Sequence, residues 1–308
     1  RLREISDTFA ANGILDIFTN SKMFEVIISE QFGHSLINGH ANTPDAINED
    51  GEIFEYKHFK LSSSNHTWTF NDFSDNTIRN LNGISYVIFA VIDDTVMIPY
   101  VYRTYFVSAN EVSDYLYEAT VRIENTRDMI NISPHQIEMN MQYSIIEPKQ
   151  IIHSKLVEHT FKTINEIEKI TGINGLLTSN KLWELLVSLE VKHMINPEQK
   201  HHDAIDEFGN TYEYKVSAEK HSWTFQDIST NVLNSYLNDD KIVLAIVNKR
   251  EFVVNSIYFC NPNAVVRILR YKLQKKMEIS AHVTRLSVGF AKRDLVELME
   301  NGEAVCIL

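Results

Sequence analysis

A stretch that carries two acidic residues and a lysine at fixed spacing occurs twice in the sequence. Residues 45–57 read DAINEDGEIFEYK and residues 203–215 read DAIDEFGNTYEYK, so that eight of thirteen positions are identical without a gap. The identical positions include an Asp and, ten residues later, a Glu-Tyr-Lys triplet. Carboxylate oxygens suit Mg²⁺, and an ammonium group attracts phosphate. If the fold brings these side chains together, each stretch could hold a divalent cation beside a phosphate.

Each copy of the stretch predicts a β-hairpin. Asp45 would end a first strand, Asp50-Gly51 would form the turn, and the alternating run that follows would be a second strand with Glu55 and Lys57. Residues two apart on a strand point to the same side, so Glu55 and Lys57 share a face and Asp45 reaches them from the neighbouring strand. In the second copy the same roles fall to Asp203, Phe208-Gly209, Glu213 and Lys215.

The alternative explanation is a repeated hairpin that is closed by ion pairs. Exposed pairs of this kind contribute only about 0–1 kcal/mol to stability. Other positions of the stretch differ between the copies: Asn48 corresponds to Asp206, and Asp50 to Phe208. Because the Asp, the Glu and the Lys are the same in both copies, we favour a functional site over a structural one.

Pro44-Asp45 followed by Glu55-Tyr56-Lys57 resembles the signature of the PD-(D/E)xK nuclease superfamily, and of type II restriction endonucleases in particular. Asp203 followed by Glu213-Tyr214-Lys215 has the same pattern. The resemblance implies an α/β fold of two tandem restriction-endonuclease-like domains, each a mixed central β-sheet flanked by helices. It also implies Mg²⁺ as the cofactor, with Mn²⁺ as a substitute.

The resemblance also gives a role to each motif residue. The metal ligands would be two carboxylates and a backbone carbonyl per copy: Asp45, Glu55 and Tyr56, and Asp203, Glu213 and Tyr214. Lys57 and Lys215 would position the attacking water and neutralise phosphate charge; nearby carboxylates should raise their pKa values, which disfavours a role as a base. Glu25 and Glu184, on the second predicted helix of each copy, are candidates for a third acid, with a solvated helix face as the alternative.

Self-comparison extends the repeat over nearly the whole chain and predicts two domains, residues 1–150 and 151–308. Each copy predicts two helices, the hairpin, a third helix, two strands and a further helix. The third helix would be capped at the start of Thr69-Phe70-Asn71-Asp72 and Thr224-Phe225-Gln226-Asp227, where Asp completes a capping box. The first of the two strands is a continuous apolar run in each copy, which predicts burial on both faces.

The composition limits the class of protein. With 44% hydrophobic and 23% charged residues the chain has the make-up of a soluble globular protein, and its longest apolar run, residues 86–92, is far too short to cross a membrane. Cys260 and Cys306 show no metal or disulfide spacing, which fits a reducing cytoplasm. The net charge of −12 argues against DNA as a partner, but residues 151–308 carry 19 basic and 20 acidic side chains, so the excess lies in the first copy.

A second repeated stretch follows each hairpin, and a basic helix lies near the end of the second copy. They supply the candidates for DNA contacts, which are His66, Trp68, His221, Trp223, Arg267 and Arg270. Packing in the core is the favoured alternative for the two Trp residues, and a role within a loop is the alternative for the two His residues. A basic helix face can follow phosphates, or it can simply be solvated.

These features together predict a Mg²⁺-dependent, site-specific DNA endonuclease of the restriction type. Each copy would hold one active site and cut one strand of double-stranded DNA, so that a monomer with an internal pseudo-two-fold axis does the work of a dimer. A cognate DNA methyltransferase would be a partner at the same site. The alternatives are one catalytic and one mainly DNA-binding copy, a repair or junction nuclease, and a non-catalytic duplicated interaction protein.

Overall fold

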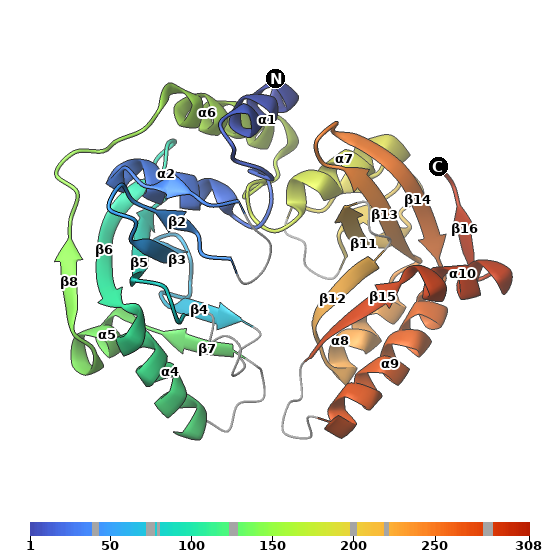
Figure 1. Ribbon diagram of the computed structural model, residues 1–308. Coiled ribbons are helices and arrows are strands. Elements are labelled where there is room, and N and C mark those ends of the chain that lie inside the picture. The colour runs from blue at the N-terminus through green and yellow to red at the C-terminus, as the bar shows by residue number, and fades with distance from the viewer. Residues whose placement is uncertain are drawn as a thin grey trace. The chain divides into compact units, whose positions relative to one another are not determined.

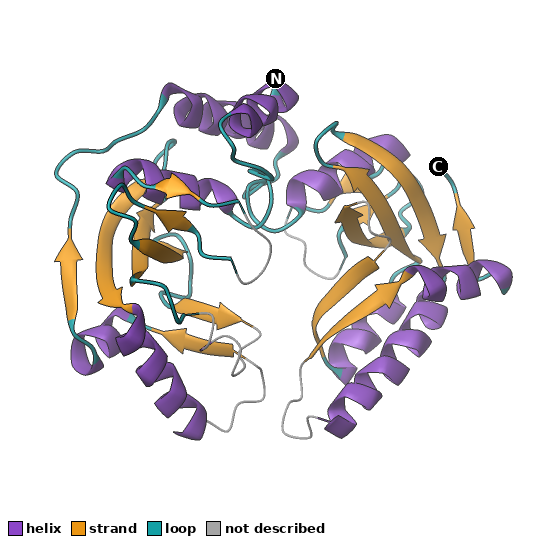
Figure 2. Ribbon diagram, in the orientation of Figure 1, coloured by secondary structure: helices purple, strands orange, loops and turns teal. Residues whose placement is uncertain are grey.

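The computed structural model describes residues 1–38, 43–71, 78, 81–122, 129–197, 202–218, 222–279 and 286–308. The chain forms two compact units, Arg1–Ile167 (unit 1) and Glu168–Leu308 (unit 2). The division falls inside helix α6 (Lys155–Thr171), seventeen residues beyond the end of the first sequence repeat at residue 150. Each unit is a mixed α/β structure with a six-stranded sheet flanked by helices (Figures 1 and 2).

The sheet of unit 1 has the strand order β1-β2-β3-β5-β6-β8. Its strands are β1 (Ser35–Leu36), β2 (Ala46–Ile47), β3 (Ile53–Lys60), β5 (Tyr86–Asp93), β6 (Tyr100–Ser108) and β8 (Tyr143–Ile146). The pair β3–β5 is parallel and the other pairs are antiparallel. A separate two-stranded sheet pairs β4 (Trp68–Asn71) with β7 (Met129–Ile132). The helices are α1 (Leu2–Ala11), α2 (Lys22–Phe32), α4 (Ala109–Arg122) and α5 (Pro134–Asn140).

Unit 2 repeats this topology strand for strand, with the order β9-β10-β11-β13-β14-β16. The strands are β9 (Met194–Ile195), β10 (Ala204–Ile205), β11 (Thr211–Ala218), β13 (Lys241–Asn248), β14 (Val253–Cys260) and β16 (Ala304–Cys306). The second small sheet pairs β12 (Ser222–Ile228) with β15 (Leu286–Ala291). The helices are α7 (Lys181–Val191), α8 (Thr230–Ser235), the 3₁₀ turn η1 (Tyr236–Asn238), α9 (Pro262–Ile279) and α10 (Lys292–Glu300).

The central strand of each unit is buried on both faces, as the continuous apolar runs predict. In β5 every side chain from Val87 to Ile92 is buried, and β13 shows the same pattern from Ile242 to Val247. In unit 1, Val87, Phe89 and Val91 pack in one cluster with α4 and the small sheet. Helix α2 packs against β3 and β6, so that the motif strand β3 lies between a helix and a core.

The predicted third helix does not begin at Thr69 or Thr224, because both residues lie within strands, β4 and β12. Trp-Thr-Phe alternates between core and surface: Trp223 and Phe225 are buried, whereas Thr224 is exposed. The period of two therefore prevails over the local capping signal. In unit 2 the helix starts later, where the Ser229 hydroxyl accepts a hydrogen bond from the backbone N–H of Val232. Asp72 lies outside the described residues.

Trp68 and Trp223 are core residues, so the prediction that they contact DNA is wrong for both. They are 0% and 1% exposed. The indole Nε1–H of Trp68 donates to the carbonyl of Ala90 at 2.8 Å, and that of Trp223 donates to Ala245 at 2.9 Å. Each Trp thus joins the small sheet to the central strand by the same buried hydrogen bond.

Among the described helices, none is long and apolar enough to cross a membrane.

We expect Trp223→Phe to lower the stability of unit 2 by about 1–3 kcal/mol, because it removes a buried hydrogen bond and part of a packed ring. Urea unfolding followed by circular dichroism measures the loss. Phe208→Leu is the control, since Phe208 is 81% exposed and its truncation should change little. Equal stability of the Trp223→Phe variant and the wild type would contradict the role of Trp223 in the core.

Candidate functional site

The hairpin of β2 and β3 fixes Asp45 against the motif strand. The backbone N–H of Asp45 donates to the carbonyl of Phe54 at 3.0 Å. In return, the Asp45 carboxylate accepts a hydrogen bond at Oδ2 from the backbone N–H of Tyr56 at 2.7 Å. The turn between them needs Gly51, whose φ of +81° is one that residues with a side chain rarely adopt. The carboxylate is therefore held beside the backbone between Glu55 and Lys57.

Glu55 and Lys57 lie on one face of β3, as the alternation predicts. The Lys57 ammonium group (Nζ) lies 2.5 Å from Oε1 of Glu55. It also lies 5.1 Å from the ring centroid of Phe70, on the neighbouring small sheet. Both side chains are about one-fifth exposed, so the pair is largely shielded and still open to solvent.

Unit 2 reproduces this arrangement with the corresponding residues. The Asp203 carboxylate accepts from the backbone N–H of Tyr214 at 2.7 Å, and Lys215 Nζ lies 2.5 Å from Oε1 of Glu213. Lys215 Nζ lies 5.5 Å from the ring centroid of Phe225. The structure thus brings the predicted Asp, Glu and Lys together in both units, and Lys215 Nζ also donates to the carbonyl of Tyr214 at 3.1 Å.

Burial and like charges act strongly on the two aspartates. Burial, followed by the charges of Glu55 and Glu25, raises the pKa of Asp45 from 3.8 to about 7. Burial, followed by the charge of Glu213, raises the pKa of Asp203 to about 8. Each site therefore crowds more negative charge than its lysine compensates.

The two lysines stay protonated. Burial acts to lower the pKa of Lys57, but the carboxylates of Glu55 and Asp45 outweigh it and raise the pKa above its usual range. The same balance, led by Glu213 among the charges, raises the pKa of Lys215. This is the direction predicted from the sequence. A lysine of this kind donates hydrogen bonds and neutralises charge, but it does not take up a proton.

Glu25 and Glu184 lie close enough to the sites for their charges to act there. Glu25 on α2 forms an ion pair with Lys22 and is 19% exposed, and burial raises its pKa. Its charge contributes to the raised pKa of Asp45. Glu184 on α7 contributes in the same way to the pKa of Asp203. A solvated helix face does not describe Glu25, whose carboxylate is largely buried next to the site.

A divalent cation at either site would have few side-chain ligands. Within the described ranges, no group of three or more His, Cys, Asp or Glu side chains is arranged to hold a metal ion. The hydrogen bond from Tyr56 uses one oxygen of Asp45, and Lys57 uses one oxygen of Glu55. Mg²⁺ commonly takes only one or two carboxylates and completes its shell with water and phosphate. The two carboxylates of each unit fit such a partial site, and a cation would relieve their repulsion.

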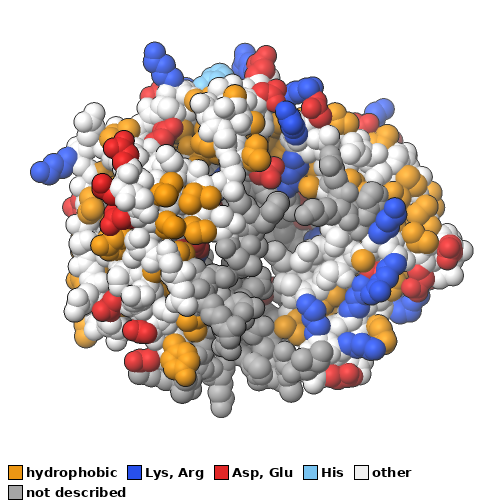
Figure 3. Space-filling view, viewed as in Figure 1, with side chains coloured by type: hydrophobic (Ala, Val, Ile, Leu, Met, Phe, Trp, Pro, Cys, Tyr) orange, Lys and Arg blue, Asp and Glu red, His pale blue; other side chains and the backbone are white. Residues whose placement is uncertain are grey.

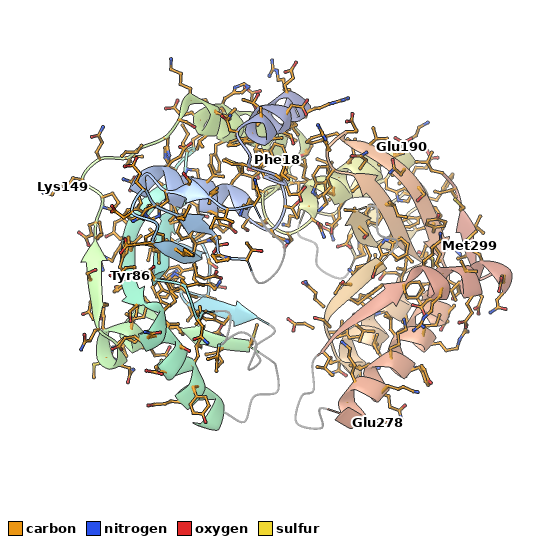
Figure 4. The ribbon with its side chains drawn as sticks, in the orientation of Figure 1. Phe18, Tyr86, Lys149, Glu190, Glu278 and Met299 are labelled. Carbon is orange, nitrogen blue, oxygen red and sulfur yellow. The ribbon has the colours of Figure 1, made fainter. Side chains whose placement is uncertain are left out.

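In each unit one histidine contacts the motif strand from its other face. The Tyr56 hydroxyl lies 2.8 Å from Nδ1 of His34, and Tyr214 lies 2.8 Å from Nδ1 of His193. His34 stacks on Phe54 at 4.1 Å between centroids. Phe54 in turn stacks on Tyr86 at 6.1 Å, and Tyr86 is labelled at the start of β5 in Figure 4. The signal in the sequence was a His at the same place after the second helix of each copy.

Each remaining candidate for a DNA contact that the structure describes has a partner within the protein. His66 is exposed, stacks on Phe59 at 5.5 Å and lies 3.2 Å from the carbonyl of Leu61. His221 lies outside the described residues. Two hydrogen bonds, of 3.0 and 2.7 Å, join Arg267 to the carboxylate of Glu303, and Arg270 donates to Asn234 at 3.1 Å.

Other basic residues of α9 are also bound within unit 2. Lys272 donates to the carbonyl of Gly289 at 3.0 Å and forms an ion pair with Asp294, and Lys276 donates to the carbonyl of Ser287 at 2.7 Å. Blue side chains gather over the region of α9 and α10 in Figure 3. These lysines of α9 bind to β15 and α10. A phosphate would therefore have to replace the carbonyl and carboxylate groups that they already contact.

Neither the known protein families nor the curated proteins include a match to this sequence.

The raised pKa of Asp203 has a consequence for stability. An Asp with a pKa of about 8 in the folded chain and 3.8 in the unfolded chain binds its proton more tightly when folded. Its contribution to stability is therefore complete below about pH 4 and is lost as the pH rises towards 8. Without metal, Asp203→Asn should be more stable than the wild type at pH 9 and equal to it near pH 4, in urea unfolding at both pH values.

Asp206→Asn is the control with the opposite sign. Desolvation acts to raise the pKa of Asp206, but hydrogen bonds from Asn210, Tyr212 and Phe208 lower it to about 2. Its ionised form therefore stabilises the fold above pH 4, and the substitution should destabilise unit 2 at neutral pH. If Asp203→Asn kept the pH dependence of the wild type, the raised pKa of Asp203 would be disproved.

Proposed function

We propose that this protein is a divalent-metal-dependent DNA endonuclease of the PD-(D/E)xK superfamily, of the restriction type, with one active site in each unit. The observation that carries the proposal is the pair of matching sites: in both units the Asp accepts from the backbone of the motif strand and the Lys donates to the Glu. The mixed sheet, with the motif strand parallel to the buried central strand, supports the restriction-endonuclease-like fold. An ion pair of structural value alone would not require the half-buried Asp beside it.

The ligands would be the Asp and Glu carboxylates with the backbone carbonyl of Tyr56 or Tyr214. When bound, Mg²⁺ would stabilise the negative charge that develops on the scissile phosphate. The hydrogen bond from the Tyr56 N–H keeps one oxygen of Asp45 in place. Glu55 would then have two roles, one oxygen holding Lys57 and the other facing the cation.

The lysine would act as a hydrogen-bond donor and a positive charge. In hydrolysis a water oxygen bonds to phosphorus, the bond from phosphorus to the leaving oxygen breaks, and the leaving oxygen gains a proton from solvent. Lys57, which is kept protonated by Glu55 and Asp45, would orient the water and stabilise the phosphate oxygens. The proton of the attacking water would pass to a phosphate oxygen or to solvent.

We expect Lys57→Ala and Lys215→Ala each to leave an enzyme that nicks one strand, and the double variant to be inactive. Each site would cut one strand, and loss of a charge that acts in the transition state typically costs about 10²–10³-fold in rate. The assay is conversion of supercoiled plasmid to nicked and linear forms with Mg²⁺. If either single variant abolished all nicking, the assignment of one strand to each site would be wrong.

The other outcomes of the same assay separate the alternatives. Full loss in one single variant and none in the other would indicate one catalytic unit and one that mainly binds DNA. No cleavage of any plasmid by the wild type, with Mg²⁺ or Mn²⁺, would favour a non-catalytic interaction protein. Cleavage of branched DNA in preference to linear duplex would indicate a junction nuclease.

Metal binding can be tested without cleavage. Mg²⁺ or Mn²⁺ should raise the unfolding temperature of the wild type, since ligand at 100 times its Kd stabilises a fold by about 2.7 kcal/mol. The double variant Glu55→Gln/Glu213→Gln should lose this increase. Glu49→Gln/Glu207→Gln is the matched control, because both residues are exposed in the hairpin turns. An increase of equal size in the Glu55/Glu213 variant would place the cation elsewhere.

A further inference from the structure

The backbone of the motif tyrosine serves each site twice. In unit 1 the N–H of Tyr56 donates to the Asp45 carboxylate at 2.7 Å. The N–H and the carbonyl of one residue point to the same side of a strand, so the Tyr56 carbonyl faces this site as well. In unit 2 the Tyr214 carbonyl accepts a hydrogen bond from Lys215 Nζ at 3.1 Å. Two of the three proposed metal ligands in each unit, the Asp and the carbonyl, therefore depend on the position of one stretch of backbone.

Pairing between strands does not fix this stretch on the side of the site. Among the described strands, β2 is the neighbour of β3 on the side of Asp45. Its register with β3 ends at Phe54, two residues before Tyr56. In unit 2 the register of β10 with β11 ends at Tyr212, two residues before Tyr214. The end of the pairing opens the tyrosine carbonyl to a cation, but it also removes the strand bonds that would otherwise hold the backbone there.

A histidine holds the side chain of this tyrosine on the opposite face of the strand in both units. Tyr56 and Tyr214 are buried, with exposed fractions of 4% and 0%. The hydroxyl of Tyr56 lies 2.8 Å from Nδ1 of His34, and that of Tyr214 lies 2.8 Å from Nδ1 of His193. Because the hydroxyl is the far end of the side chain, this hydrogen bond fixes the ring and thereby limits rotation of the backbone that carries it.

The histidine is itself held by two contacts. Directly after the end of the second helix, the backbone N–H of His34 donates to the carbonyl of Ser29 at 2.9 Å, and the imidazole ring stacks on Phe54 at 4.1 Å. The N–H of His193 donates to the carbonyl of Ser188 at 2.9 Å, and its ring lies 4.0 Å from the aromatic ring that corresponds to Phe54. The end of the helix is thus joined to the motif strand in the same way in both units.

We infer that His34 and His193 are positioning residues of the two sites. By holding the hydroxyl of the motif tyrosine, each keeps the tyrosine backbone where its carbonyl, and the Asp that its N–H binds, can meet a divalent cation. Substitution of a residue that supports a metal ligand typically costs about 10–100-fold in metal affinity or activity. The inference rests on the proposed function, because it concerns the same cation. The alternative is that the two histidines only fill space beside the strand.

The test uses the full chain with Glu213→Gln as the parent, in which unit 1 keeps the intact site. His34→Phe keeps an aromatic ring and removes the hydrogen bond, Tyr56→Phe removes the same bond from the other side, and His34→Asn keeps a polar atom near the place of Nδ1. The electron paramagnetic resonance signal of free Mn²⁺ measures metal binding, and nicking of plasmid is measured against Mg²⁺ concentration. His135→Phe changes an exposed residue of α5 and is the matched control.

His34→Phe and Tyr56→Phe should each raise the Kd for Mn²⁺, and the Mg²⁺ concentration at half-maximal nicking rate, by about 10–100-fold. The double variant should lose no more than either single variant, since both remove one shared hydrogen bond. His34→Asn should recover most of the affinity, and the control should match the parent. Loss of folded protein would lower the maximal rate but leave the Mg²⁺ concentration at half-maximal rate unchanged. Circular dichroism checks the fold of each variant.

The outcomes separate this inference from the proposed function. Unchanged Mn²⁺ affinity and Mg²⁺ dependence in both single variants of an active parent would overturn the inference and leave the proposed function intact. Additive losses in the double variant, or a His34→Asn variant as weak as His34→Phe, would also overturn it, because the effect would then come from packing of the rings. A wild type and a parent that neither bind Mn²⁺ nor nick plasmid would overturn the proposed function, and the inference with it.

Discussion

The hydrogen bond from a backbone N–H of the motif strand to the aspartate beside it organises each site. The N–H of Tyr56 and that of Tyr214 both point at an Asp carboxylate at 2.7 Å. Because this donor belongs to the backbone, it fixes the carboxylate relative to the strand and not to any mobile side chain. Glu and Lys, which flank the donor in sequence, are fixed on the same strand. The geometry of all three charged groups therefore follows from one short hairpin.

The hairpin places two carboxylates close together in each unit. Glu25 on α2 and Glu184 on α7 add further negative charge at the same place. Burial and the neighbouring carboxylates hold the pKa values of Asp45 and Asp203 near 7 and 8. The same carboxylates keep Lys57 and Lys215 protonated, so each lysine is an electrostatic and orienting group. Such strongly shifted groups in a partly open site are typical of functional sites. The crowding is a cost to the fold that a bound cation would remove.

Short-range patterns predicted much of this structure. The alternating run in β3 and the apolar run in β5 gave the strands, and the spacing gave the approach of Asp45 to Glu55 and Lys57. The capping signal at Thr224 failed because burial of Trp223 and Phe225, which depends on β15 and β13, outweighs it. His34 was missed because its partner Tyr56 is 22 residues away and meets it only after folding.

The alternation of β3 gives its two faces opposite chemistry. Glu55 and Lys57 carry the charges on one face, whereas Tyr56 reaches His34 on the other. Insertion or deletion of a single residue within this strand would exchange the two faces and dismantle both sets of contacts. The strands β3 and β11 are accordingly both eight residues long. Directly after them the copies differ in length: eleven positions separate Lys57 from Trp68, but eight separate Lys215 from Trp223. This change in chain length falls outside the strand, so it leaves the two faces of β3 and β11 unchanged.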